Sequence, residues 1–364
     1  MVKKEKKSNW LTKTKRPIVI AGPCSAESEQ QVFETARRLK ETNKADIIRA
    51  GIWKPRTRPN SFEGVGVRGL PWLQKVKTEL DMPVTVEVAK ASHVELCLEF
   101  GIDILWIGAR TTVNPFAVQE IADALRGVDI PLLIKNPINP DLALWLGAFE
   151  RMEKAGLTEL GAIHRGFSYT GEKYYRNRPQ WQIPIEFMRE RPELPMIGDP
   201  SHICGRRDIL QAVGQKAMDL DFDGLMIESH IDPDNAWSDA KQQITPEVFG
   251  SMITDMVLRE DYQEDKPIQS TLDKFRSELK NIDDDIVELL SNRMNISRQI
   301  GSYKKDNNIT IYQNKTWDKK LERAMMIGTS QGLSEDFIRK LFACIHDESI
   351  NQQHLIMKAN GGDK

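Results

Sequence analysis

The sequence predicts two domains of different class: an α/β domain built as a (β/α)₈ TIM barrel, then an all-α helical domain. Short apolar runs of strand type recur eight times before residue 230, and each is followed by a helical pattern. Beyond residue 270 the apolar residues follow only helical spacing. We therefore predict a barrel domain over residues 1–258, a polar linker over 259–270 and a helical domain over 271–364.

Composition narrows the class of protein. The chain of 364 residues is 40% hydrophobic and 29% charged, as expected for a globular protein of two domains. Its net charge of -2 gives no electrostatic reason to bind nucleic acid or an anionic membrane. No apolar stretch is long enough to span a bilayer, and none follows the basic N-terminus as in a secretory signal. We expect a cytoplasmic protein.

The eight predicted strands are short, apolar and rich in isoleucine, valine and leucine. They cover residues 17–21, 46–50, 83–88, 103–107, 131–134, 160–163, 195–197 and 224–227. Periodicity alone also fits an open, doubly wound sheet. The polar and charged clusters decide between the two, because almost all of them directly follow a strand. In a closed barrel these clusters converge on one face, whereas an open sheet spreads them along a line, so we favour the barrel.

Cations are the most frequent members of these clusters. They are Arg49, Lys54, Arg56, Arg110, Lys135 and Arg165. Six positive charges directed at one barrel mouth repel one another unless anions bind among them. The planar guanidinium suits carboxylate and phosphate, so we predict a strongly anionic ligand with more than one phosphate group.

A second set of residues at the same mouth has the chemistry of metal ligands. It comprises Cys24, His202, Glu228 and Asp239. A thiolate, an imidazole and two carboxylates form a site of mixed softness, and the sulfur argues against magnesium or calcium. We predict a divalent transition metal: Mn, Fe, Co or Zn. His230, two residues after Glu228, either supports a ligand or belongs to the loop.

Residues 64–69 fit the glycine pattern G-x-G-x-x-G of dinucleotide-binding proteins. A proline-rich segment precedes them instead of the strand that such a site requires. We interpret the segment as a flexible loop over the barrel mouth.

Six motifs occur in a fixed order over residues 16–258: A-G-P-C-S, R-x-x-x-x-K-P-R-T, I-G-A-R, H-R-G, D-P-S-H and S-D-A-K-Q. Together they resemble the compact group of 3-deoxy-D-arabino-heptulosonate 7-phosphate (DAHP) synthases. The resemblance implies the condensation of phosphoenolpyruvate with erythrose 4-phosphate. It implies that Cys24, His202, Glu228 and Asp239 hold the metal, that Arg49, Lys54, Arg110, Lys135 and Arg165 bind phosphoenolpyruvate, and that Arg56 and Thr57 meet the sugar phosphate. Lys54 is also the expected catalytic residue, placed either to contact both substrates or to donate a proton.

One residue departs from this pattern. Arg58 stands between Thr57 and Pro59, where the family usually has serine. It either adds a phosphate contact or lies on the surface. The related octulosonate-phosphate synthases, which use arabinose 5-phosphate, are the alternative for the barrel. They carry a K-A-N-R type segment where this chain has K-P-R-T at residues 54–57, so the four-carbon acceptor is favoured.

Three helices are predicted in the tail, over residues 271–304, 315–330 and 334–358. Arg293 and Lys304 are eleven residues apart, so they differ by only about 20° around the first helix. Arg276 lies about 100° away from Arg293 by the same geometry. A dimer in which Arg276 enters the pocket of the partner subunit accounts for this arrangement.

Residues 271–357 resemble the all-helical chorismate mutases, which convert chorismate to prephenate. The resemblance implies a homodimer formed through the helical domain and a site of Arg293, Lys304, Gln353 and Arg276 of the partner subunit. The family commonly has an Arg-Glu pair where this chain has Thr316 and Trp317. The chain is thus expected to be a bifunctional enzyme of the shikimate pathway, and the alternative is a barrel with a non-catalytic tail for dimerisation or ligand sensing.

Regulation is the last expectation from the sequence. Only about 16 residues precede the first predicted strand, too few for a ligand-sensing module. We therefore expect prephenate, bound in the helical tail, to inhibit the barrel by feedback.

Overall fold

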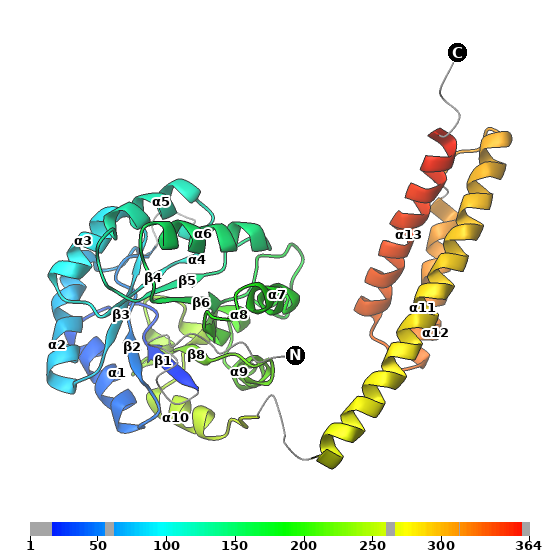
Figure 1. Cartoon of the computed structure of the whole chain (residues 1–364). Coiled ribbons are helices and arrows are strands. Elements are labelled where there is room, and N and C mark those ends of the chain that lie inside the picture. Colours follow the sequence, from blue (N-terminus) through cyan, green and yellow to red (C-terminus); the bar gives the residue numbers. More distant parts are fainter. Residues whose placement is uncertain (1–16, 55–61, 260–265, 313, 359–364) are drawn as a thin grey trace. The chain divides into compact units, whose positions relative to one another are not determined.

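The computed structural model describes residues 17–54, 62–259, 266–312 and 314–358. The chain divides into two compact units, Met1–Asp261 and Tyr262–Lys364. The first is a closed barrel surrounded by helices, and the second contains three helices (Figure 1).

Eight parallel strands close the barrel in sequence order, and β8 pairs with β1. They are β1 (Ile18–Gly22), β2 (Ile47–Arg49), β3 (Val84–Val88), β4 (Ile104–Ile107), β5 (Leu132–Lys135), β6 (Leu160–His164), β7 (Met196–Gly198) and β8 (Gly224–Glu228). The predicted barrel and all eight strands are confirmed. The main difference is at the carboxyl ends, where Lys135, His164 and Glu228 are the last strand residues rather than loop residues. These side chains therefore sit on the rigid sheet.

The barrel interior is filled by large apolar side chains from alternating strand positions. They are Ile18, Ile20, Ile47, Ile104, Trp106, Leu133, Ile163, Ile197 and Met226. A second, larger apolar cluster joins the outer face of the strands to the surrounding helices. This two-layer packing is why apolar residues run nearly continuously along each strand. The interior is a packed core, so a ligand has access only at the rim.

The outer helices follow the strands around the barrel (Figure 1). They are α1 (Glu29–Glu41), α2 (Leu70–Leu80), α3 (Ala91–Glu99), α4 (Ala109–Thr112), α5 (Pro115–Ala124), α6 (Leu142–Lys154), α7 (Gln182–Glu190), α8 (Pro200–Cys204), α9 (Leu210–Asp219) and α10 (Pro246–Thr254). Several begin at a side chain that accepts a backbone N–H: Ser28 for α1, Asn114 for α5, Asp141 for α6 and Thr245 for α10.

The glycine-rich segment is not a flexible loop, so that prediction was wrong. Gly66–Gly69 forms a 3₁₀-helix, η2, that runs directly into α2. The N–H of Gly66 donates to the carbonyl of Ile52 (2.9 Å), and a Cβ on Gly64 (φ +98°) would lie 2.1 Å from that same oxygen. Glycine is needed at position 64 because the segment lies directly against residue 52, two positions before Lys54, and it is favoured at Gly66 by the positive φ of +65°.

The second unit consists of α11 (Lys266–Asp306), α12 (Asn314–Ser330) and α13 (Glu335–Lys358). The three predicted helices are confirmed, but α11 begins five residues before its predicted start at residue 271. Ser334 caps the N-terminus of α13, since its hydroxyl accepts the N–H of Phe337 (3.3 Å). No helix among the described residues is long and apolar enough to cross a membrane.

Apolar side chains of α11 are largely exposed. Nine of them, here called the α11 stripe, lie 40–69% exposed: Leu272, Phe275, Leu279, Ile282, Ile286, Leu289, Ile296, Ile300 and Tyr303. Among the described apolar residues of this unit, only Ile338 is fully buried. A single copy of the three helices therefore forms almost no hydrophobic core of its own.

Candidate active sites

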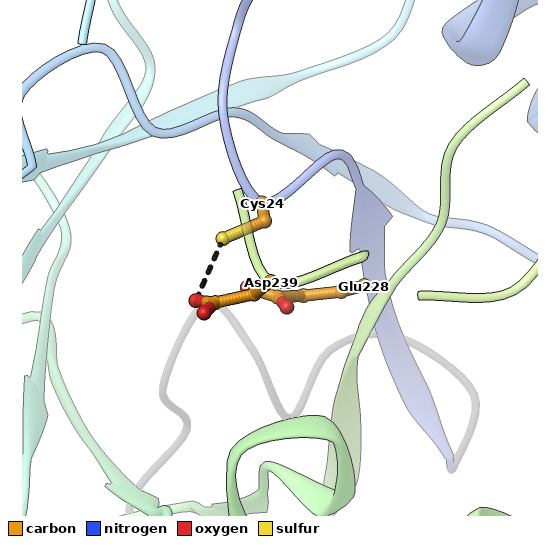
Figure 2. Close-up of side chains that lie close together, drawn as sticks. All are labelled: Cys24, Glu228 and Asp239. Atoms are coloured by element: carbon orange, nitrogen blue, oxygen red, sulfur yellow. Dashed lines mark hydrogen bonds between the residues drawn. The ribbon is translucent and has the colours of Figure 1, made fainter. Parts of the chain in front are cut away.

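A cluster of acidic and thiol groups lies at the barrel rim (Figure 2). Cys24 follows β1, Glu228 ends β8, and Asp239 lies in the segment beyond β8. One ligand atom from each falls within 4.8 Å of the others, and Cys24 Sγ lies 3.3 Å from Asp239 Oδ2. Cys24 and Glu228 are fully buried. Three of the four residues predicted as metal ligands thus lie together.

The fourth, His202, lies beside this cluster. Its Nε2 is 3.6 Å from Glu228 Oε1, while its Nδ1 is 2.8 Å from Asp199 Oδ2. Asp199 also accepts the backbone N–H of His202 as the cap of α8 (3.1 Å), so one carboxylate fixes both the ring and its helix. His230 is directed elsewhere, since its Nε2 lies 3.3 Å from Glu27 and its Nδ1 accepts the N–H of Asp232.

These donors fit a divalent transition metal. Glu228 Oε1 is buried and has no hydrogen-bond partner, so it is available as a ligand. Burial and the negative charge of Glu228 raise the pKa of the Cys24 thiol to about 12. A bound cation is therefore needed to favour the thiolate at neutral pH. Mixed sulfur, oxygen and nitrogen donors suit transition metals rather than magnesium or calcium.

Residues that the sequence analysis did not identify hold the ligands in place. Gln242 Nε2 donates to Glu228 Oε2 (2.6 Å), and Arg176 Nη1 contacts both Gln242 Oε1 (2.5 Å) and Asp239 Oδ1 (3.1 Å). Burial alone would raise the pKa of Asp239, but Arg176 and other nearby cations hold it below its usual range. The only sequence signal for Gln242 was its position three residues after Asp239 in the quoted S-D-A-K-Q motif.

Lys54 is the cation nearest to the cluster. Its Nζ lies 2.9 Å from Cys24 Sγ and 2.8 Å from the Cys24 carbonyl oxygen. Burial opposes its charge, but Cys24 and Glu228 prevail and raise the pKa of Lys54 above its usual value. The preceding residue is also fixed, because the Trp53 ring stacks on His93 at 3.8 Å. Arg56, Thr57 and Arg58 lie outside the described residues.

Two further cations flank a buried aromatic ring inside the rim. Arg49 and Lys135 lie over Trp106, at 5.0 and 5.9 Å from the ring centroid. Arg49 Nη2 lies 3.3 Å from Glu228 Oε1, and Lys135 donates to Asp199 (2.8 Å). Arg49 Nε and Nη1 are buried without a hydrogen-bond partner. These unused donors point to an anionic ligand, because buried donors are normally satisfied.

Arg165 experiences the same excess of positive charge. Burial, and then the charges of Arg176 and Arg110, lower its pKa to about 10 despite the opposing effect of Asp199. Arg110 lies at the start of α4, after β4. Those of the predicted cations that the structure describes therefore gather at one mouth of the barrel. A bound anion there would relieve the repulsion among them.

The third strand contributes a residue that was overlooked. Glu87, in β3, accepts the indole N–H of Trp106 (3.2 Å). A Cβ on Gly108 would lie 1.9 Å from Glu87 Oε1, so glycine leaves room for this carboxylate. Its signal in the sequence was a glutamate within the otherwise uncharged strand V-T-V-E-V.

A second site lies within the helical unit. A cavity of about 250 Å³ is lined by three of the four residues predicted there, Arg293, Lys304 and Gln353. The other lining residues are Ile296, Ser297, Ile300, Ile311, Trp317, Lys320, His346 and Ser349. Arg276 is not among them; it is exposed on α11 and pairs with Asp273 (3.0 Å).

Hydrogen bonds between α11 and α13 shape this cavity. Arg293 donates to the hydroxyl of Ser349, Ser297 donates to the Ser349 carbonyl (3.2 Å), and Gln353 Nε2 donates to Ser297 Oγ (3.3 Å). Gln353 Oε1 remains buried without a partner. Burial lowers the pKa of Arg293 and of Lys304. The cavity thus offers cations and amide groups to a polar, anionic molecule.

The fold and the rim define a class of protein: a (β/α)₈ enzyme with a candidate metal site and a cluster of cations at the mouth of its barrel. The sequence profile of the DAHP synthetase I family matches residues 3–264, and that of chorismate mutase type II matches residues 275–354. The chain belongs to the DAHP synthetase I family and carries a chorismate mutase domain after the barrel, so it is a bifunctional enzyme of the shikimate pathway.

Individual proteins are similar to about two thirds of the chain. Phospho-2-dehydro-3-deoxyheptonate aldolase of Thermotoga maritima is 33% identical over 65% of this chain and 68% of its own. The crystal structure of the DAHP synthase from that organism matches with a TM-score of 0.59, over 65% of this chain and 67% of its own, at 31% identity. A 2-dehydro-3-deoxyphosphooctonate aldolase of Legionella pneumophila is 28% identical over 61% of this chain and 84% of its own.

The position of Gln242 leads to a prediction about metal affinity. Gln242→Leu removes the donor that holds Glu228 Oε2, so the carboxylate loses its fixed orientation. We expect Mn²⁺ to bind roughly 10–100-fold more weakly, as measured by titration calorimetry on metal-stripped protein. The control is Gln119→Leu on α5, which should bind Mn²⁺ as the unmodified chain does. Equal affinity in both variants would contradict the role of Gln242.

Proposed function

We propose that the barrel joins phosphoenolpyruvate to erythrose 4-phosphate at the rim formed by Cys24, Glu228 and Asp239, with His202 as the fourth metal ligand. The observation that carries this proposal is the juxtaposition of a buried thiol and carboxylate cluster with unsatisfied arginine donors. Arg49, Lys54, Arg110, Lys135 and Arg165 would hold phosphoenolpyruvate, and Arg56 and Thr57 the sugar phosphate.

In the reaction, carbon 3 of phosphoenolpyruvate attacks the aldehyde carbon of the sugar with the electron pair of its double bond. Water adds to carbon 2, and inorganic phosphate leaves. A divalent metal, when bound, supplies a Lewis acid that polarises the aldehyde oxygen. Arg49 and Lys135, held on strand ends, fix the phosphate and carboxylate of phosphoenolpyruvate and so orient carbon 3. Lys54, protonated and next to Cys24, supplies a proton to the oxygen that becomes negative during attack.

The choice of sugar rests on the segment at residues 54–57. Its K-P-R-T sequence supports the four-carbon acceptor over arabinose 5-phosphate. The similarities point the same way, since the heptonate aldolase of Thermotoga is 33% identical and the octonate aldolase of Legionella 28%.

Cys24 provides the test of the metal-dependent reaction. Cys24→Ala removes the sulfur ligand, and we expect barrel activity to fall at least about 1,000-fold because the Lewis acid is lost. Circular dichroism should report an unchanged fold. Cys344→Ala removes an exposed thiol on α13 and should leave the activity intact. If chelator-treated Cys24→Ala protein kept full activity, the metal-dependent mechanism would be wrong.

For the helical unit, we propose that Arg293, Lys304 and Gln353 bind chorismate and promote its rearrangement to prephenate. Such a rearrangement needs no nucleophile; it needs a dicarboxylate held in a folded conformation and a donor on the breaking ether bond. Lys304 and Gln353 are placed in the same cavity for the second task. Arg293, fixed by Ser349, suits a carboxylate.

We also propose that two chains dimerise through the α11 stripe. Its residues follow alternating spacings of three and four, as in a coiled coil, except that Arg293 occupies the position between Leu289 and Ile296. Residue 286 lies at the middle of α11, which spans 41 residues. If two α11 helices pair antiparallel about this point, Arg276 of the partner subunit lies opposite Ile296, a residue that lines the cavity. Within its own chain Arg276 is roughly 25 Å from Arg293 along the helix.

Subunit mixing tests this arrangement. Arg276→Ala and Arg293→Ala should each abolish mutase activity, because every pocket then lacks one arginine. In a mixed dimer one pocket contains both arginines and the other contains neither, so about a quarter of the unmodified activity should return in an equimolar mixture under statistical exchange. The measurement is chorismate consumption after subunit exchange, which is verified with differently tagged chains.

No recovery despite exchange would place both arginines in one pocket or give them a structural role. A chain that forms dimers and binds prephenate but does not consume chorismate would support the other interpretation, a tail that only senses a ligand.

We propose, finally, that prephenate bound in the helical cavity inhibits the barrel. The proposal is supported by the fusion of two domains in one chain: the barrel is proposed to catalyse an early step of the pathway, and the helical domain to form a later product. Coupling between two sites is reciprocal in binding free energy and typically amounts to about 1–3 kcal/mol. Binding of phosphoenolpyruvate should therefore weaken prephenate binding by the same factor.

Truncation after Asp261 separates the two units and tests the coupling. We expect prephenate to reduce the heptulosonate-forming activity of the full chain several-fold at saturation and to leave the truncated barrel unaffected, because its binding cavity is gone. The measurement is phosphoenolpyruvate consumption with and without prephenate. Equal inhibition of both chains, or none in the full chain, would refute the proposal.

A further inference from the structure

The helical cavity contains a cation that neither the sequence nor the resemblance to chorismate mutases assigned. Lys320, on α12, lines it together with Arg293 and Lys304 of α11. Among the described residues no carboxylate lines the cavity. We propose that Lys320 binds one of the two carboxylates of the substrate and that His346 adds a hydrogen bond at the same end. This inference rests on the proposed mutase function of the cavity.

Helix geometry brings Lys320 and an aromatic pair to the same place. Trp317 and Lys320 are three residues apart, on one face of α12, and both line the cavity. The Trp317 ring stacks on His346 of α13, with centroids 4.0 Å apart and an angle of 14° between the planes. This stack fixes α12 against α13, so it sets where Lys320 and the imidazole meet the cavity.

His346 carries an unused hydrogen-bonding atom. Its Nε2 is buried and has no partner. Burial, with the charges of Lys320 and Arg293, lowers the pKa of His346 although Asp347 opposes this effect. The imidazole is therefore neutral at pH 7 and offers one nitrogen to a ligand. A buried polar atom of this kind is normally satisfied, and the cavity it lines is where a ligand can satisfy it.

The charges are arranged for a dianion. Lys320 is close enough to Lys304 to contribute, after burial, to the lowered pKa of that residue. Three cations around a cavity of about 250 Å³ repel one another, and a ligand with two carboxylates relieves this repulsion better than a monoanion. Arg293 lies on α11 and Lys320 on α12, so the two carboxylates can be held from different helices.

The chain differs from the common mutase sequence at residues 316 and 317, and this difference is what makes Lys320 important. Where the mutase family commonly has an Arg-Glu pair, this chain has Thr316 and Trp317, so α12 lacks the usual cation at that point. Lys320 supplies a positive charge from the next turn of the same helix. The chain thus retains a cation on α12, displaced along the helix, and uses the tryptophan to position the neighbouring histidine.

The test uses the full chain and a pair of neighbouring lysines. Lys320→Gln removes the proposed counter-ion, and Lys319→Gln removes an exposed charge next to it that does not line the cavity. Prephenate is the probe, with its dissociation constant measured by calorimetry and KM and kcat measured for chorismate. We expect Lys320→Gln to weaken prephenate binding and raise KM about 10–100-fold, while Lys320→Arg restores most of both and Lys319→Gln changes them less than twofold.

His346→Phe keeps an aromatic ring for stacking on Trp317 and removes Nε2. We expect it to raise KM several-fold with little change in thermal stability, which separates ligand binding from a structural role. If Lys320→Gln behaves like Lys319→Gln, the inference is wrong. The variant Arg293→Ala distinguishes a failure of this inference from a failure of the proposed function. If Arg293→Ala loses prephenate binding while Lys320→Gln binds prephenate normally, only the role of Lys320 is refuted. Normal binding in both variants would mean that the cavity is not the mutase site.

Discussion

Buried positive charge at the barrel rim is the constraint on which the rest of the first unit depends. Arg49 is 1% exposed, beside the fully buried Cys24 and Glu228, and Lys54 contacts the same thiol. Removing such charges from water costs several kcal/mol for each ion unless partners compensate. Glu228 and Asp199 compensate in part, and the unsatisfied donors of Arg49 leave the remainder to an anionic ligand. In the proposed reaction, the same charges that would destabilise an empty rim would provide binding energy for the phosphorylated substrates.

The barrel determines how accurately these groups are held. Lys135 and Glu228 end strands, where each is paired with one neighbouring strand. Lys135 pairs with Ile163 of β6, and Glu228 pairs with Gly22 of β1. Asp199 and Gln242 then orient His202 and Glu228 from outside the cluster. Catalysis by positioning requires such supporting contacts, because a shift of about 1 Å at the reacting atoms is costly.

The helical unit depends on an exposed apolar surface rather than on buried charge. Its exposed α11 stripe leaves the three helices with almost no core, and its cavity holds Arg293, Lys304 and Lys320 but not Arg276. In the proposed dimer, one event, the pairing of two α11 helices, buries the apolar stripe and completes the pocket. Folding, assembly and activity of this unit would then depend on the same surface, which explains why apolar residues are retained where a lone helix would favour polar ones.

The sequence by itself determined the eight strands, the three tail helices, and the gathering of Cys24, Arg49, Lys135 and Glu228 at one mouth. These follow from local periodicity and from the rule that parallel strands of a barrel present their carboxyl ends on one face. Only the tertiary structure decided which neighbouring residues support these site residues. Glu87, Trp106 and Gln242 contact the site through side-chain packing between distant segments, and Gly64 and Gly66 were misread because their contact with Ile52 is not local. From the sequence alone, Lys320 could not be distinguished from the other lysines of its helix, because spacing along a chain does not specify which face a neighbouring helix will cover. The stack of Trp317 on His346 brings Lys320 to the cavity.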